Sequence, residues 1–321
     1  RKFGVRSAMP ISRALRLCPD AMCVPVPRKA CSEKSHEIRT VLSRFAPVVE
    51  GASIDEWYMD LGGTEGIYHH EALAMTAHRM REAVKQETGL SVSIGGGTNK
   101  LVAKLAVERA KPKPGTDADG VHVVAAGDEE NFLATFTLAE LPMVGPRFQE
   151  RLADRGMRTV NDVRRHTLDD LRMLISAREA EWLWHRVHGV DHSEVEGGGE
   201  AKSISRDETF SEDLREDRDL ERELLALVTR AAFDLRGDGM TARTITVKLR
   251  DMDFRTRSAQ RTLLEPVVSD RVIYHVAREL LHKLRAARRI PARLIGVSLS
   301  SLAFDPLADQ LALFGSADPD S

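Results

Sequence analysis

The sequence predicts an α+β protein built from several domains, and three observations carry this prediction. Over the first 125 residues, apolar runs with the period-2 alternation of strands alternate with segments of helical periodicity. A polar, glycine-rich stretch, 193–201, then has the composition of a flexible linker. Beyond it, β-runs alternate with two helices, which predicts a repeated β-sheet with both helices on one face.

Composition restricts the class of protein. A chain of 321 residues, 42% hydrophobic and 30% charged, is long enough for two to four domains of ~100–200 residues with ordinary cores. No run approaches the ~18 apolar residues of a membrane span, and no apolar signal region opens the chain, so we expect a cytoplasmic protein without a membrane partner. The three cysteines lack metal-ligand spacing, which fits a reducing compartment. A net charge of −2 does not identify a partner.

Residues 47–61 read as a strand, a tight turn and a second strand. In the second run Trp57, Met59 and Leu61 share one face, and Tyr58 takes the other, which is the alternation of a half-buried strand. We therefore expect a hairpin with one face on a core.

Two adjacent carboxylates, Asp55 and Glu56, lie at the turn of this hairpin. In a straight strand they would point to opposite faces, so they reach one ion only if the chain bends at or beside Ser53. Carboxylates at such a bend form a hard-oxygen site suited to Mg²⁺, which takes further ligands from water and phosphates. The alternative interpretation is an acidic hairpin tip.

A candidate anion site follows in the chain. A strand is expected over 90–94, and Gly95-Gly96-Gly97 leads into a helix that ends at Ala110. Thr98 or Asn99 can cap this helix, which places Lys100 in its first turn. Backbone N–H groups and the dipole at a helix start favour an anion.

Residues 138–162 predict a helix-hairpin-helix. Pro142-Met143-Val144-Gly145 forms the bend, and Pro146 opens the next helix at a position that needs no backbone N–H. Such hairpins grip a DNA phosphate with backbone N–H groups, which makes Val144 and Gly145 candidate DNA contacts. An ordinary helix pair is the alternative.

Basic side chains gather around the expected strand 244–250 near the end of the chain. Arg243, Lys248 and Arg250 are candidate phosphate contacts, whose binding would depend on salt. A solvated charged face remains an alternative, because the helix around 212–223 is acidic. The basic residues of this stretch outnumber the acidic Asp251 and Asp253, and they are Arg243, Lys248, Arg250, Arg255, Arg257 and Arg261.

Four stretches together resemble a known family. Ser53-Ile54-Asp55-Glu56, followed by Trp57-Tyr58-Met59-Asp60, resembles the Ser-x-Asp-Glu-x-Tyr-x-Asp palm motif of Y-family (translesion) DNA polymerases. Residues 1–10, 97–106 and 141–145 agree with that family in order and spacing, most closely with its bacterial DNA polymerase IV branch. The resemblance covers almost the whole chain.

The resemblance implies a domain order. It assigns a remnant of the fingers, a polymerase palm, a helical thumb with the helix-hairpin-helix, a linker, a little finger with a β-sheet and two helices, and a flexible tail. The corresponding ranges are 1–26, 27–125, 126–192, 193–201, 202–303 and 304–321.

The resemblance also implies an activity, the template-directed addition of a dNTP to a primer 3′-hydroxyl with two Mg²⁺ ions. Asp55 would bridge both ions and Glu56 would serve the ion on the primer side. Arg1 and Lys100 would hold the triphosphate, where a guanidinium pairs well with phosphate oxygens. For Arg1 the alternative is a solvated basic terminus.

Near its end the chain resembles the Gln-Leu-x-Leu-Phe peptide by which bacterial polymerases bind the sliding clamp. The matching residues are Gln310, Leu311, Leu313 and Phe314. Apolar side chains in a tail with no core to join need a partner. We therefore expect a monomer that binds primer–template DNA, a dNTP and the bacterial sliding clamp.

The departure from the family is at the start, because the first residue is Arg and the family's first strand, with another metal-binding Asp, is absent. We expect the chain as printed to be a fragment, or to have a misassigned start, and to be catalytically incomplete. Two alternatives stay open. One is a non-catalytic relative that binds DNA and the clamp, and the other is a helix-hairpin-helix repair protein such as a glycosylase, with Asp154 or Asp162 available for catalysis.

Overall fold

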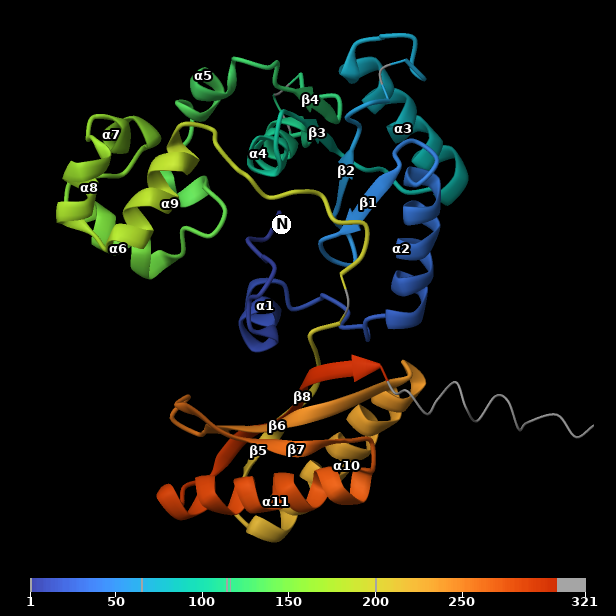
Figure 1. Cartoon of the computed structure of the whole chain (residues 1–321), viewed down its shortest axis with the longest axis vertical. Coiled ribbons are helices and arrows are strands. Elements are labelled where there is room, and N and C mark those ends of the chain that lie inside the picture. Colours follow the sequence, from blue (N-terminus) through green and yellow to red (C-terminus); the bar gives the residue numbers. More distant parts are fainter. Residues whose placement is uncertain (1, 65, 114, 116, 200, 305–321) are drawn as a thin grey trace, which may run out of the picture. The chain divides into compact units, whose positions relative to one another are not determined.

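The computed structural model describes residues 2–304, apart from residues 65, 114, 116 and 200. The chain divides between Gly198 and Gly199 into two compact units, which are described separately (Figure 1). Within the described residues, no helix has both the length and the apolar character that a membrane span needs. Arg1 and the expected clamp-binding residues Gln310, Leu311, Leu313 and Phe314 lie outside the described residues.

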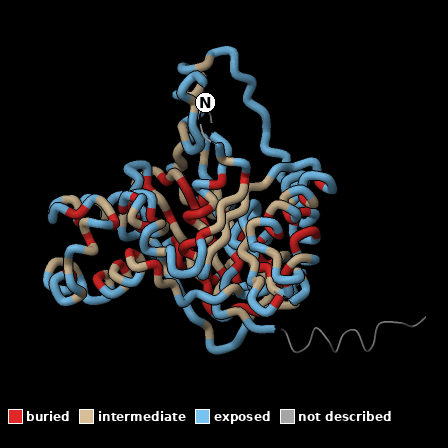
Figure 2. The backbone as a smooth tube through the Cα atoms, turned by 90° about the horizontal axis from the view of Figure 1, so that it is seen from above, coloured by how far each residue is buried: buried red, intermediate tan, exposed pale blue. Residues whose placement is uncertain are grey.

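The first segment of unit 1 has little core of its own. Its helix α1 (Ile11–Leu17) contains no buried residue. Phe3, Met22 and Val26 are likewise exposed. Figure 2 shows this N-terminal stretch as a largely exposed loop and helix.

The palm region contains the expected hairpin. Strand β1 (Val48–Gly51) pairs antiparallel with β2 (Trp57–Asp60). Helices α2 (Arg28–Leu42) and α3 (Leu73–Thr88) pack together, and the hairpin lies against their buried side chains. The apolar face of the second strand, Trp57, Met59 and Leu61, joins this core, as the alternation predicts.

A second, two-stranded sheet carries the next helix. Strand β3 (Ile94–Gly96) runs parallel to β4 (Val121–Val123), and α4 (Lys100–Ala110) packs on β3. Gly95 permits this close packing, because a Cβ at that position would lie 2.3 Å from the carbonyl oxygen of Ala103.

The bounds predicted for this strand, 90–94, are wrong, because regular pairing begins only at Ile94. The guanidinium of Arg81 donates to the carbonyl of Val92 at 3.0 Å. A side chain therefore satisfies a backbone group that a longer strand would have paired with its neighbour.

The thumb region consists of short helices with strongly defined starts. They are α5 (Glu129–Leu133), the 3₁₀ helix η1 (Leu138–Glu140), α6 (Pro146–Ala153), α7 (Val160–Arg164), α8 (Leu168–Leu174) and α9 (Ala177–Val187). Capping boxes begin four of them, at Thr137, Thr159, Thr167 and Ser176. Their buried side chains form one core that includes Leu152, Leu171 and Leu183.

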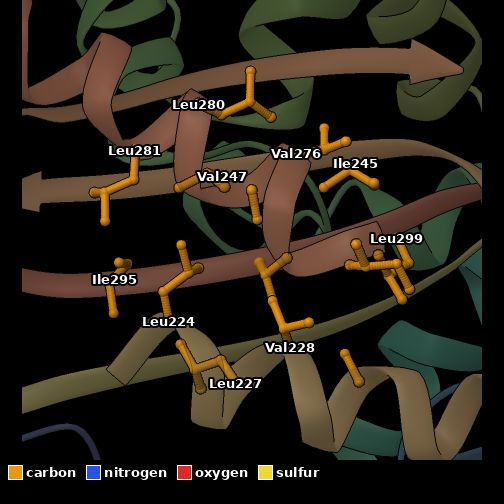
Figure 3. Packing of buried hydrophobic residues seen from close by; sticks show 14 of the residues in the cluster. Leu224, Leu227, Val228, Ile245, Val247, Val276, Leu280, Leu281, Ile295 and Leu299 are labelled. Atoms are coloured by element: carbon orange, nitrogen blue, oxygen red, sulfur yellow. The ribbon is translucent and has the colours of Figure 1, made fainter. Parts of the chain in front are cut away.

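Unit 2 contains the expected sheet with two helices. Strands β5 (Ser203–Leu214), β6 (Met240–Asp251), β7 (Thr256–Val267) and β8 (Ala292–Phe304) pair antiparallel in the order β5-β8-β6-β7. Helices α10 (Asp217–Gly237) and α11 (Asp270–Ala287) cover one face. Figure 3 shows Leu224 and Val228 of α10 and Leu281 of α11 facing Val247 and Ile295 of the sheet. The predicted α+β architecture is confirmed.

Candidate active site and DNA-binding surfaces

The chain bends sharply at the tip of the palm hairpin. The backbone N–H groups of Ala52 and Ser53 both donate to the carbonyl of Glu56, at 2.9 and 3.2 Å. Ser53 Oγ donates to Asp55 Oδ1 at 2.6 Å and accepts the N–H of Asp55 at 3.3 Å. Asp55 and Glu56 are exposed at this bend, and Ser53 orients the first of them.

One face of the hairpin lies against one face of α4. Glu50 and Tyr58 are cross-strand partners, and Lys100 and Lys104 lie one helical turn apart on α4. Lys100 forms an ion pair with Glu50, and Lys104 forms one with Glu56. Lys100 also lies 5.2 Å from the centre of the Tyr58 ring. Acidic and basic side chains therefore alternate along this wall.

Burial and charge shift two pKa values on this wall. Burial raises the pKa of the Tyr58 phenol, which therefore stays protonated at neutral pH. Burial would also raise the pKa of Glu50, but hydrogen bonds from Lys100 and from the N–H of Glu196 outweigh it and lower that pKa. The Glu50 carboxylate is consequently ionised and faces a charged lysine.

Tyr58, Lys100 and Lys104 line a cleft of about 1580 Å³ in unit 1. Asp55 and Glu56 lie on its wall together with Lys100, Lys104 and Lys111. Lys104 and Lys111 are functional candidates that the sequence analysis missed. The signal was present, because they follow Lys100 at intervals of four and eleven residues and so share a helix face.

The donor set at the bend fits Mg²⁺ in its chemistry. Asp55 and Glu56 offer exposed carboxylate oxygens, the ligands that Mg²⁺ prefers. Among the described residues, no three His, Cys, Asp or Glu side chains gather closely enough to hold a metal ion by themselves. Ions bound by these two carboxylates would therefore need further ligands, such as phosphates, water or backbone carbonyls.

The helix-hairpin-helix bend leads directly into a helix start that no side chain caps. Val144 is buried in the thumb core, whereas Met143, with φ of 68°, is exposed. Gly145 is the N-cap of α6, and no side chain caps that helix start. Gln149 Nε2 donates to the carbonyl of Val144 at 2.7 Å and fixes the bend. The uncapped start of α6 has the polarity that favours a phosphate.

The open face of the sheet in unit 2 is rich in hydroxyl groups. Strand register places residues from all four strands in rows on this face, since directly paired residues point to the same side. The rows are Ser203–Ser300–Thr244–Thr262, Ser205–Ser298–Thr246–Gln260, Asp207–Gly296–Lys248–Ser258 and Thr209–Leu294–Arg250–Thr256.

The structure divides the predicted basic cluster of this region. Lys248 and Arg250 lie on the open face, where Lys248 pairs with Asp207 and Arg250 donates to Thr256 Oγ1 at 2.9 Å. Arg243 lies beside an irregularity in the β6–β7 register and donates to the carbonyl of Leu263 at 3.2 Å.

Two other arginines of the cluster do not lie on the open face, contrary to the prediction of one basic sheet face. Arg257 pairs with the fully buried Asp251, and Arg261 pairs with Glu279 of α11. Both therefore lie on the helix-covered face of β7. They do not add positive charge to the open face of the sheet.

Comparisons with known proteins identify the family. Two family models match the chain, the impB/mucB/samB family over residues 1–108 and the impB/mucB/samB family C-terminal domain over residues 201–313. The DNA polymerase IV of Caulobacter vibrioides is 36% identical over 302 residues, which cover 94% of this chain and 72% of that relative. The chain belongs to the Y-family of DNA polymerases. Its resemblance to the DNA polymerase IV branch is thereby confirmed.

Other relatives of this Y-family polymerase agree. The DNA polymerase IV of Methanoculleus marisnigri is 36% identical and covers 94% of this chain and 81% of its own. A Y-family DNA polymerase chimera of Dbh and Dpo4 has a TM-score of 0.84 at 24% identity, covering 95% of this chain and 86% of its own. An insertion ternary complex of Dbh DNA polymerase has a TM-score of 0.62 at 23% identity, with coverages of 95% and 86%. At such identities the structural likeness shows the fold.

Proposed function

We propose that this chain is a translesion DNA polymerase, which adds a dNTP to a primer 3′-hydroxyl opposite a template base. One observation carries the proposal. The adjacent carboxylates Asp55 and Glu56 lie at a bend on the wall of the same cleft as Lys100, Lys104 and Lys111. Oxygen donors for a metal ion thus lie beside cations for a triphosphate, which is the arrangement that phosphoryl transfer requires.

The carboxylates at the bend would hold two Mg²⁺ ions, with Asp55 bridging both and Glu56 serving the primer side. Mg²⁺ bound there supplies Lewis-acid stabilisation of the charge on the transferred phosphoryl group. The hydroxyl of Ser53 holds one oxygen of Asp55 and so restricts the rotation of that carboxylate. Glu56 would exchange its ion pair with Lys104 for the metal.

The lysines of α4 would receive the triphosphate. Lys100, at the start of the helix, would bind phosphate oxygens, and Lys104, released from Glu56, would add a second cation. Arg1 would contribute a bidentate contact. Asn99 Oδ1 accepts the N–H of Val102 at 3.0 Å and so fixes the helix start that carries Lys100.

Primer–template DNA would be held in two places. The uncapped start of α6, at Val144 and Gly145, would bind a phosphate through backbone N–H groups. The hydroxyl-rich face of the little finger, with Lys248, Arg250 and the neighbouring Arg243, would bind further phosphates without reading sequence.

The remaining parts of the proposal concern partners. Gln310, Leu311, Leu313 and Phe314 would bind the bacterial sliding clamp. The polymerase would act as a monomer in the cytoplasm, in DNA repair and error-prone replication past damage.

A second candidate is a non-catalytic relative that binds DNA and the clamp. It is favoured by the lack, among the described residues, of a third side chain that would complete a metal-binding group. We therefore also propose that efficient catalysis needs a further carboxylate besides Asp55 and Glu56, such as the Asp of the family's first strand.

Primer extension in Mg²⁺ tests these proposals. It would be measured for the printed chain and for a longer protein in which the family's first strand precedes Arg1. We expect the longer protein to extend primers, and Asp55→Ala or Glu56→Ala to abolish extension while DNA binding survives. The matched control is Glu33→Ala, which removes an exposed carboxylate from α2. Primer extension that persists in both variants would show that Asp55 and Glu56 have no catalytic role and form only an acidic turn.

A further inference from the structure

One oxygen of Glu50 connects the cleft to the segment that leads toward unit 2. Glu50 Oε2 accepts a hydrogen bond from Lys100 Nζ and another from the backbone N–H of Glu196, the latter at 2.8 Å. The Lys100 and Glu50 side chains are only 14% and 24% exposed. Solvent therefore screens this pair only in part.

Residues 191–198, which we call the strap, cross the palm region of unit 1. The strap begins at Asp191, whose side chain is 7% exposed and whose carboxylate lies 3.7 Å from the guanidinium of Arg186. Further along, the carbonyl of Gly197 accepts from Arg39 Nη2 at 3.4 Å. Figure 1 shows the strap, in yellow, passing α4 and β1. At Glu196 the strap contacts Glu50, the residue that also pairs with Lys100.

We propose that Glu50 is a positioning residue that couples phosphate binding at Lys100 to the docking of the strap. The inference rests on the proposed role of Lys100. Glu50 holds the ammonium of Lys100 and the backbone N–H of Glu196 at one oxygen.

A phosphate that engages Lys100 removes the counter-charge of Glu50 and brings another anion close to it. A half-buried carboxylate in that situation is destabilised and turns toward water. Its hydrogen bond to Glu196 is then lost, so the strap loosens. Because coupling is reciprocal, a docked strap weakens phosphate binding by the same factor.

One substitution of Glu50 separates its two contacts, and a second substitution elsewhere is the control. In Glu50→Gln the amide oxygen still accepts the N–H of Glu196, but no charge retains Lys100. Tripolyphosphate should therefore bind Glu50→Gln at least about fivefold more tightly than the unaltered chain, the lower end of typical coupling. Glu129→Gln is the control, because Glu129 is bonded to Thr98 beside Lys100 and its substitution removes the same charge.

The decisive readout is hydrogen exchange at the Glu196 amide, followed by NMR while metal-free tripolyphosphate is titrated into the full chain. We expect the ligand to accelerate exchange in the unaltered chain and to leave it unchanged in Lys100→Met. A merely structural role of Glu50 would not make the exchange rate depend on the ligand.

The outcomes distinguish the inference from the function on which it rests. If tripolyphosphate binds through Lys100 without changing exchange at Glu196, or if Glu129→Gln tightens binding as much as Glu50→Gln, the coupling is overturned. If binding is equal in the unaltered chain and in Lys100→Met, the proposed role of Lys100 fails as well. Primer extension by the Asp55 variant decides the polymerase function independently.

Discussion

Asp207 of β5 and Lys248 of β6 form an ion pair that spans the strand between them. The intervening residue on β8 is Gly296, paired in register with both. A Cβ on Gly296 would lie 1.8 Å from Asp207 Oδ1, so only glycine leaves room for this bridge. The pair occupies the open face of the sheet and neutralises one of its few cations.

Asp207→Asn should strengthen non-specific DNA binding. Lys248 would lose its counter-ion and could neutralise one more phosphate, which steepens the slope of log affinity against log salt by about 0.9. Fluorescence anisotropy with duplex DNA at several salt concentrations measures this slope.

The control for this prediction is Glu208→Gln, which removes the same charge from the next residue of β5. Glu208 points to the other face of the sheet, toward Arg230 of α10. A slope unchanged in Asp207→Asn, or changed equally in Glu208→Gln, would contradict a phosphate-binding role for Lys248.

Gly296→Ala should destabilise unit 2, because the added methyl group displaces the Asp207 carboxylate. This carboxylate is the far end of an exposed side chain and can turn toward water, so we expect a loss of only about 0–1 kcal/mol in the free energy of unfolding, the usual contribution of an exposed ion pair. The double variant Asp207→Gly with Gly296→Ala removes the clash and should recover part of this loss. Urea unfolding of the three variants measures the coupling, and strictly additive losses would refute the steric explanation.

Asp251→Ala should be among the most damaging substitutions in unit 2. Asp251 is fully buried and accepts from Arg257 at 2.8 and 3.0 Å and from Arg288 at 2.9 Å. Removing one member of a buried charge pair costs about 3–5 kcal/mol. Asp253→Ala, at a more exposed partner of Arg288, should cost only about 0–1 kcal/mol. Chemical denaturation giving equal losses would show that the burial of Asp251 is not what matters.

Leu313→Ala combined with Phe314→Ala should abolish binding to the bacterial sliding clamp, because both apolar side chains are needed to fill a groove on a partner. DNA affinity should stay unchanged, since the substitutions leave the folded units intact. Calorimetry with purified clamp tests this, and Asp318→Ala, a few residues further along the chain, is the control. Undiminished clamp binding by the double variant would place the clamp contact elsewhere.

Local signals in the sequence predicted much of the fold. The start of α4 after Asn99 and the start of α6 at Pro146 both follow from capping and turn residues. The alternation of Trp57, Met59 and Leu61 predicted the buried face of the hairpin. Each of these signals depends on residues close in the chain, which is why it could be read without the structure.

Contacts between distant segments could not be predicted in this way. The pairing of Lys100 with Glu50 and of Lys104 with Glu56 joins elements about fifty residues apart. For Arg257 and Arg261 a signal did exist. They lie an even number of residues from Ala259 and Leu263, which face the core. Alternation along β7 would therefore have placed them on the helix-covered face.

The order of strands in the little finger has a consequence for synthesis on the ribosome. Strand β8 lies between β5 and β6, yet it is the last of the four to be made. Until β8 emerges, β5 lacks its partner and the apolar side chains of α10 have only part of a sheet to cover. In the thumb, each capping box joins residues three positions apart, so these helix starts can form without waiting for a distant segment. We therefore expect the thumb to fold during synthesis and the little finger to close only after its final strand has left the exit tunnel.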